Sequence, residues 1–200
     1  SCRVCVVEVN GRQVSACTQP AAEGLEVDNS SDAIVEERRN LLQMLFVEGN
    51  HVCPGCEKSG ACQLQAVAYY TGMLSPHYTH FFPQRSVDAS HPDTAIDFNR
   101  CILCELCVRA SRDVDHKNVF SLGGRGIDAH LVINSSSGKL GDSTFAATDK
   151  AAHVCPVGAI LPKHRGYEQP IGKRLYDRQP ISIVGDVAAN EPGNKGDGNG

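Results

Sequence analysis

The sequence lacks several features that mark large classes of protein. It has no tryptophan and two methionines among 200 residues, and no apolar run approaches the roughly 18 residues that suggest a membrane-spanning helix. With 19 basic and 23 acidic residues the formal net charge is −4, and no basic stripe is left for a nucleic acid. We therefore expect no direct insertion into a membrane and no nucleic-acid partner.

Nucleotide-binding and secretory signatures are also missing. The glycine run at residues 123–126 reads Gly-Gly-Arg-Gly, which matches neither the dinucleotide fingerprint nor the phosphate-binding loop. We expect no NAD, FMN or ATP site in this chain and no catalytic residue. The first five residues lack the basic and then apolar stretches of a secretory signal, so we expect a cytoplasmic location.

Cysteine, in contrast, is abundant. A chain of this size can build a core without disulfides, and in a reducing compartment closely spaced cysteines more often bind metal. The ten cysteines form three local groups and one outlier: Cys2, Cys5 and Cys17; Cys53, Cys56 and Cys62; Cys101, Cys104 and Cys107; and Cys155.

The third group is the most specific. Cys101, Cys104 and Cys107 have the CxxCxxC spacing of bacterial ferredoxins, and Cys155 is followed by proline as in those proteins. In two-cluster ferredoxins the cysteine before proline serves the other cluster, but this sequence has no second CxxCxxC run. We therefore expect these four cysteines to hold one [4Fe–4S] cluster. A zinc ribbon is the alternative, although it prefers two CxxC pairs.

The middle group has three cysteines where a [4Fe–4S] cluster needs four ligands. His51 precedes Cys53, Cys56 and Cys62, and imidazole replaces thiolate in Rieske centres. We expect His51 to be the fourth ligand. The alternative is that His51 is an ordinary polar residue of a loop.

The first group is one ligand short. Cys2, Cys5 and Cys17 resemble the latter part of a plant-type [2Fe–2S] site, in which a further cysteine precedes the CxxC pair. We expect the sequence to begin inside a domain whose remaining ligand lies upstream of Ser1. The alternative is a start at Ser1 with a zinc site or a labile site of three cysteines.

Hydrophobic periodicity predicts few long elements. Two strands, over residues 4–9 and 13–17, are expected around an Asn-Gly turn. A helix capped by Asp32 is expected to run to Gly49, and a shorter helix is expected over 63–70. A turn that begins at Cys101 is expected to run into another short helix that ends at Arg112. Further strands are expected over 118–122 and 130–134, and a loop over 73–97.

Three arginines adjoin the cysteine groups: Arg3, Arg100 and Arg109. Positive charge or hydrogen bonding beside a cluster raises its reduction potential. Solvation at the surface is an equally good explanation of their positions.

The cysteine groups and their flanking residues resemble a known family. The segments that carry the resemblance are Cys2–Val9, Glu48–His51, Cys53–Gly60, Cys62–Gln65, Cys101–Cys104, Cys155–Ile160 and Pro170–Arg174. The chain is similar, from residue 1 to about residue 177, to the iron–sulfur subunits related to the N-terminal module of the large NADH-dehydrogenase subunit of complex I. Within that group it most resembles the small diaphorase subunits of bidirectional NAD-reducing nickel–iron hydrogenases. The wider group places three residues between the histidine and the first cysteine, whereas one separates His51 from Cys53.

The resemblance implies an α+β architecture in four parts. Residues 1–31 would be the C-terminal part of a β-grasp [2Fe–2S] domain, 32–97 a helical segment with a His/Cys3 [4Fe–4S] cluster, 98–183 a ferredoxin-like [4Fe–4S] segment, and 184–200 a flexible tail. FMN, NAD and the nickel–iron centre would lie on partners, namely a flavin- and NAD-binding diaphorase subunit and the hydrogenase small and large subunits.

The function implied is a relay of single electrons between those partners. Two alternatives stay open. The chain could be the iron–sulfur module of an NAD-dependent formate dehydrogenase or of complex I, or a zinc-stabilised interaction protein without a redox role.

Overall fold

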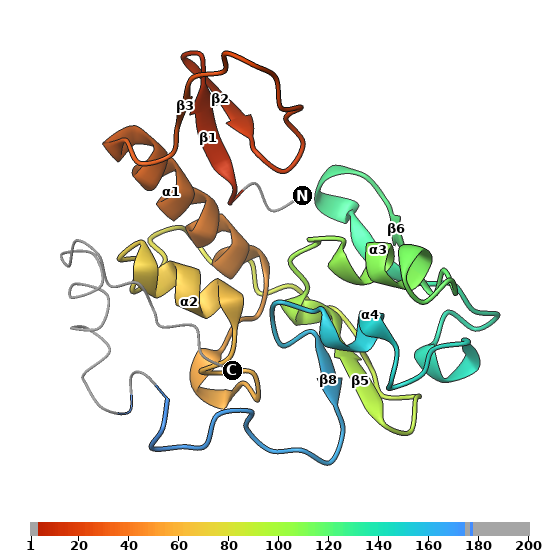
Figure 1. Cartoon of the computed structure of the whole chain (residues 1–200). Coiled ribbons are helices and arrows are strands. Elements are labelled where there is room, and N and C mark those ends of the chain that lie inside the picture. Colours follow the sequence, from red (N-terminus) through yellow and green to blue (C-terminus); the bar gives the residue numbers. More distant parts are fainter. Residues whose placement is uncertain (1–3, 175–176, 178–200) are drawn as a thin grey trace.

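A computed structural model of the chain describes residues 4–174 and residue 177 (Figure 1). The expected tail over 184–200 and the candidate ligand Cys2 lie outside the described residues. The helices are α1 (Asp32–Glu48), α2 (Gln63–Tyr70), α3 (Leu106–Asp113) and α4 (Lys150–His153). The strands are β1 (Val6–Val9), β2 (Arg12–Ser15), β3 (Val27–Asp28), β4 (Val87–Asp88), β5 (Thr94–Asp97), β6 (Phe120–Gly123), β7 (His130–Ile133) and β8 (Ile160–Pro162). None of the helices in the described part combines the length and apolar character needed to cross a membrane.

The first sheet has the strand order β2-β1-β3, and all its pairings are antiparallel. The expected Asn-Gly turn is confirmed: Asn10 and Gly11 have φ values of 49° and 76°, the positive values that a type I′ hairpin turn requires. Arg38 of α1 donates from Nη2 to the Val6 carbonyl over 2.7 Å. This bond attaches the sheet to the helix that leads to the middle group of cysteines.

Helices α1 and α2 pack on one hydrophobic core. Its buried members are Leu42, Leu64, Ala68, Met73, Val157 and Ala159. Both helices were expected from the sequence and are confirmed, but the N-cap of α1 is Ser31, and Asp32 is the first helical residue. A carboxylate in the first turn of a helix is stabilised by the positive end of the helix dipole, so Asp32 also suits the first helical position.

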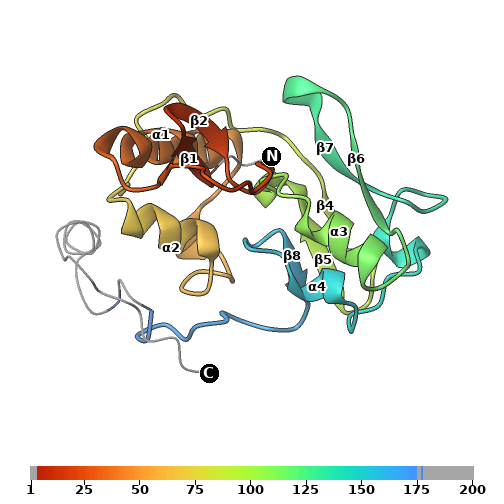
Figure 2. The ribbon, with the colours of Figure 1, turned by 45° about the horizontal axis from the view of Figure 1, so that its top comes forward.

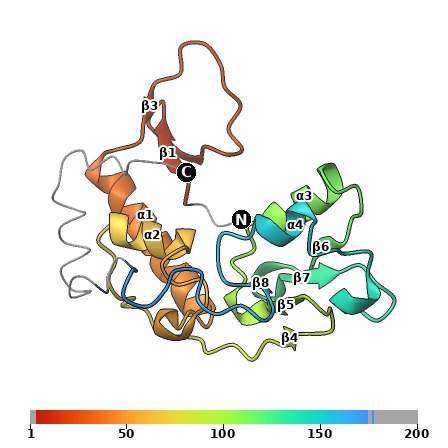
Figure 3. The same cartoon turned by 60° about the horizontal axis from the view of Figure 1, so that its bottom comes forward.

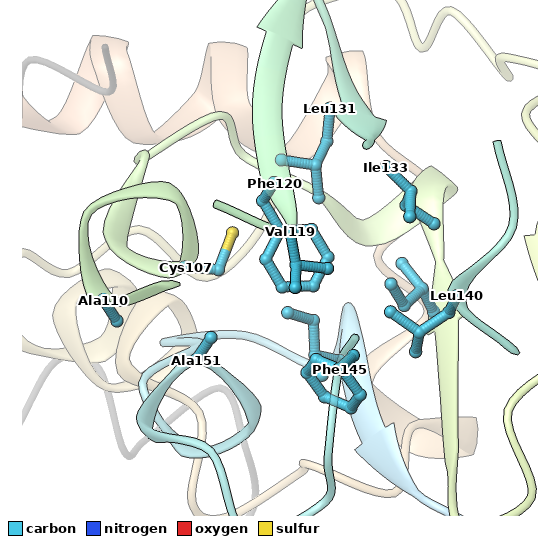
Figure 4. Close-up of a cluster of buried hydrophobic side chains, with 11 residues drawn as sticks. Cys107, Ala110, Val119, Phe120, Leu131, Ile133, Leu140, Phe145 and Ala151 are labelled. Atoms are coloured by element: carbon cyan, nitrogen blue, oxygen red, sulfur yellow. The ribbon is translucent and has the colours of Figure 1, made fainter. Parts of the chain in front are cut away.

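The second half of the chain surrounds another core. Figure 4 shows Cys107 of α3 in one buried cluster with Phe120, Leu131 and Phe145. The sheet β4-β5-β8 and the hairpin β6-β7 contribute Ile96, Ile133 and Ile160. The expected loop over 73–97 is wrong in part, since it contains β4 and β5. Strand β5 alternates two buried residues with two half-buried ones, too short a pattern to stand out between loops.

Two cysteines connect the two cores. Cys101 and Cys155 are half-buried and pack against both hydrophobic clusters. In Figures 2 and 3, α1 and α2 lie on one side of the molecule, and α3, α4 and the later strands lie on the other. The junction therefore places the middle and third cysteine groups next to each other.

Candidate metal centres

The middle group of candidate ligands lines a single hollow. His51, Cys53, Cys56 and Cys62 all face it, together with Arg100 and Gly158. The hollow holds about 350 Å³ not filled by protein atoms, including the solvent at its mouth. We call it the first hollow. The structure thus brings together the four residues that the sequence predicted for one site.

Local hydrogen bonds hold the loop between Cys56 and Cys62. The buried side chain of Gln65 accepts from the Gly60 amide over 2.8 Å and donates to Ser59 Oγ over 3.3 Å. The first amide of α2, at Gln63, donates to the carbonyl of Pro156 over 2.9 Å. These bonds fix the start of α2, where Cys62 is the N-cap, against the segment that follows Cys155.

Asn50 fixes the approach of His51. Its amide donates to the Asn99 carbonyl over 2.9 Å, and its side chain donates to Asn99 Oδ1 and to the Pro83 carbonyl. A Cβ at Gly49 would come within 2.6 Å of His51 Nε2, so only glycine lets the imidazole lie where it does. The asparagine contacts were not predictable from the sequence, because they join positions about fifty residues apart.

The imidazole of His51 suits metal ligation. Its Nε2 is buried and has no hydrogen-bond partner among the described residues. Burial, helped by the charge of Arg100, lowers the pKa of His51 to about 4, so the ring is neutral near pH 7. A neutral imidazole offers a lone pair, and a buried polar atom without a partner is costly unless something binds it. The residues therefore fit a group that accepts that lone pair.

The third group lines a second hollow of about 380 Å³, which again includes solvent at its mouth. Cys101, Cys104, Cys107 and Cys155 all face it. Most of the other lining side chains are apolar: Ile102, Leu103, Leu122, Leu131, Val157, Ala159 and Ile160. Such a lining keeps water away from the sulfur atoms, which is one of the factors that set cluster potentials.

The backbone between these cysteines is strained. Leu103 and Glu105 have φ values of 53° and 64°, in the left-handed region that residues with a Cβ rarely adopt. Each such residue costs on the order of 1–3 kcal/mol, and strain of this kind concentrates at functional sites. Neither residue is a glycine or an asparagine, so residue type does not indicate this conformation.

Burial raises the pKa of four of the thiols that line the two hollows. It raises the pKa of Cys53 to about 11 and that of Cys107 to about 12, and neighbouring cysteines add to both effects. Burial also raises the pKa values of Cys62 and Cys101. A metal must therefore displace these protons when it binds, and soft thiolates favour iron–sulfur clusters, zinc or Cu(I).

The first group is described only in part. Burial alone would raise the pKa of Cys5, but hydrogen bonds from the backbone and side chain of Cys17 outweigh it, and the pKa is lowered. The Ala16 amide also donates to the Cys5 carbonyl over 3.0 Å. Two of the three cysteines expected for this site thus lie together, and Cys2 is not among the described residues.

Among the described residues, no three or more histidine, cysteine, aspartate or glutamate side chains gather around a point that could hold one metal ion. A cluster has a different requirement, because each of its ligands binds a separate iron atom. The two hollows, each faced by four candidate ligands, are the relevant observation for such a group.

Comparison with known proteins defines the class. Residues 1–32 match a 2Fe-2S iron-sulfur cluster binding domain, and residues 95–161 match a 4Fe-4S single cluster domain. Residues 38–77 match the NADH-ubiquinone oxidoreductase-G iron-sulfur binding region. The chain is an iron–sulfur protein of mixed helix and strand content.

Individual relatives define the family. The chain is 40% identical over 182 residues to the gamma subunit of the NAD-reducing hydrogenase HoxS of Cupriavidus necator, covering 90% of this chain and 77% of that subunit. A crystal structure of an NAD⁺-reducing nickel–iron hydrogenase in the H2-reduced state contains a chain of 54% identity. It superposes with a TM-score of 0.83 over 94% of this chain and 81% of that one. This chain belongs to the family of the NAD-reducing hydrogenase gamma subunit, and it is an electron-transfer subunit.

More distant relatives are longer. NADH-quinone oxidoreductase subunit 3 of Thermus thermophilus is 33% identical over 161 residues, which are 74% of this chain and 20% of that subunit. The expected relationship to an NADH-dehydrogenase subunit of complex I is therefore confirmed for the part that the two chains share.

Proposed function

We propose that this chain relays single electrons between two partners of an NAD-reducing hydrogenase complex. One partner is a diaphorase subunit that binds flavin and NAD(H), and the other is the pair of small and large subunits that holds the nickel–iron centre. Oxidation of dihydrogen would thereby be coupled, reversibly, to reduction of NAD. The similarity to the gamma subunit of such an enzyme supports this assignment.

Three clusters would carry the electrons: one [2Fe–2S] cluster and two [4Fe–4S] clusters. The proposed ligands are Cys2, Cys5, Cys17 and a residue upstream of Ser1 for the first; His51, Cys53, Cys56 and Cys62 for the second; and Cys101, Cys104, Cys107 and Cys155 for the third. We propose that residues 1–31 are part of a β-grasp domain, followed by cluster segments over 32–97 and 98–183, and that the complex is cytoplasmic.

One observation carries the proposal: the two hollows share a wall. Val157 and Ala159 line the second hollow, whereas Gly158 between them lines the first. Gly158 also follows Cys155, a candidate ligand of the second hollow, by three residues. Clusters in the two hollows would therefore be separated by a single layer of chain, and such a short separation favours electron transfer between them.

Iron–sulfur clusters supply one chemical capacity here, the uptake and release of one electron at a time, over potentials of roughly −700 to +450 mV. The residues of this chain would hold the clusters at fixed spacing, exclude water and tune the potentials. They break no substrate bond. Hydride exchange with NAD would belong to the flavin on a partner.

The test is anaerobic purification of the whole complex, followed by reduction from either end. We expect about ten iron atoms assigned to this chain, a brown colour, and bleaching of the visible absorption by NADH and equally by dihydrogen. A colourless chain with two or three zinc ions would overturn the proposal. Molybdenum with formate-dependent bleaching, in place of nickel, would assign the chain to a formate dehydrogenase instead.

A further inference from the structure

Arg100 connects the two candidate cluster sites. It directly precedes Cys101, which faces the second hollow, yet its own side chain lines the first. Its Nη1 donates to Cys56 Sγ over 3.6 Å and to the Gly158 carbonyl over 3.4 Å. The guanidinium thus contacts a sulfur atom of the first hollow and the wall that separates the hollows.

Two carboxylates hold the guanidinium in this position. Nη1 lies 2.7 Å from Glu57 Oε2, and Nε lies 2.9 Å from Asp97 Oδ2. The Arg100 and Asp97 side chains are 20% and 18% exposed, so this ion pair is largely shielded from water, whereas Glu57 is 45% exposed and water screens its charge. Arginine keeps its charge at any physiological pH, and its planar fork fits several acceptors at once.

Two arginines of α3 make different contacts. Arg109 donates to the carbonyl oxygen of Cys104 over 3.3 Å, and this bond is exposed. Arg112 pairs with its exposed neighbour Asp113. Arg100 differs from both, because its guanidinium is half-buried and reaches the sulfur atom of a candidate ligand.

We propose that Arg100 raises the reduction potential of the cluster in the first hollow relative to the cluster in the second. The inference rests on the proposed function. A cluster becomes more negative by one charge when it accepts an electron. A positively charged group that donates a hydrogen bond to one of the ligand sulfur atoms stabilises that reduced form. The electron comes from the neighbouring reduced cluster, which is oxidised by one electron, and no bond is made or broken. Arg100 therefore acts through the sulfur atom of Cys56, and it favours the state in which the electron is on the first cluster.

The test uses the holocomplex with Arg100→Gln or Arg100→Lys, and with Arg109→Gln as the matched loss of charge at the other site. The solution potential of each complex is set with dithionite and mediators, and EPR measures the fraction of each cluster that is reduced at each potential. For Arg100→Gln we expect about a tenfold shift of the first cluster's reduction equilibrium toward the oxidised form, which is 59 mV for one electron. Arg100→Lys should shift it in the same direction by less, because the charge remains and the fork is lost.

The controls separate the two proposals. Arg109→Gln should leave the midpoint of the first cluster unchanged. An unchanged midpoint in Arg100→Gln with full iron content, or an equal shift in Arg109→Gln, would overturn the inference and leave the relay intact. If Arg100→Gln fails to assemble, an unchanged midpoint in Arg100→Lys overturns the inference. Absence of iron from the unmodified complex would overturn the proposed function itself.

Discussion

Gly158 lies directly against Cys56. A Cβ on Gly158 would come within 2.8 Å of Cys56 Sγ, 3.2 Å of Lys58 Cβ and 3.4 Å of Arg100 Nη1. Protein interiors are packed as densely as organic crystals, so a methyl group here must displace one of these neighbours. Only glycine therefore fits at position 158, where the chain lies against Cys56 in the first hollow.

Gly158→Ala should weaken the first cluster selectively. Overpacking of this kind costs about 1–3 kcal/mol, and the sulfur atom of Cys56 is among the groups that must move. We expect a loss of up to about four of about ten iron atoms per chain, which is one [4Fe–4S] cluster. Iron and acid-labile sulfide, measured after anaerobic purification, check this.

Gly166→Ala is the matched control, because a Cβ at Gly166 meets no atom within 4 Å. It should retain the iron content of the unmodified protein. Full iron content and an unaltered EPR spectrum in Gly158→Ala would contradict the prediction.

The sequence was informative where a site is local. Cys53 and Cys56, or Cys101 and Cys104, are separated by two residues within each pair, and that spacing alone makes their convergence predictable. The contact of Arg100 with Cys56 joins positions 44 apart, and it exists only because the two cores meet. No local pattern encodes such a contact. For the same reason the pairing of β5 with β8 could not be predicted from residues 73–97.

Ser111 stabilises the second core through one hydrogen bond. Its Oγ accepts from the Val119 amide over 2.8 Å, and both residues are 1% exposed. Ser111→Ala leaves that buried amide without a partner, which costs about 1–3 kcal/mol of unfolding free energy. The midpoint of guanidinium-induced unfolding under anaerobic conditions measures the loss.

Ser121→Ala is the control for Ser111. The Ser121 hydroxyl donates to Asn134 Oδ1 in an exposed hydrogen bond, so its removal should change stability by no more than about 0.5 kcal/mol. Equal effects of the two substitutions would show that the buried bond is not the stabilising contact.

Asp149 should stabilise the fold equally at pH 6 and pH 8. Burial alone would raise the pKa of its carboxyl, but hydrogen bonds from Lys117 Nζ and the Ala146 amide outweigh it, and the pKa is lowered. Because the folded state binds the proton less tightly than the unfolded state, the stabilisation is complete above the ordinary carboxyl pKa of about 3.9. It fades only as the pH falls through the lower pKa of the folded state.

Asp149→Asn should therefore reduce the unfolding free energy by the same amount at both pH values. The loss is expected to be about 1–3 kcal/mol, since the side chain is only 10% exposed and its bond to Lys117 is charged. Thermal unfolding at pH 6, 7 and 8 checks this. A loss that shrinks between pH 8 and pH 6 would mean that the carboxyl titrates near neutrality.

His51 is the candidate ligand whose replacement gives the clearest spectroscopic answer. His51→Ala removes the buried Nε2 that has no partner among the described residues, so the first cluster should lose an iron or change its EPR signal. His51→Cys should retain the cluster at a lower potential, because a thiolate ligand adds negative charge where imidazole adds none. EPR-monitored titration of both variants distinguishes these effects.

His80→Ala is the control for His51. His80 also has a buried ring nitrogen, Nδ1, without a partner among the described residues, but its ring stacks on Phe82 with centroids 4.6 Å apart and does not line the first hollow. Its removal should leave the cluster signal unchanged. If His80→Ala alters the signal and His51→Ala does not, His80 supplies the fourth ligand. If neither does, the first cluster has its fourth ligand outside these two histidines.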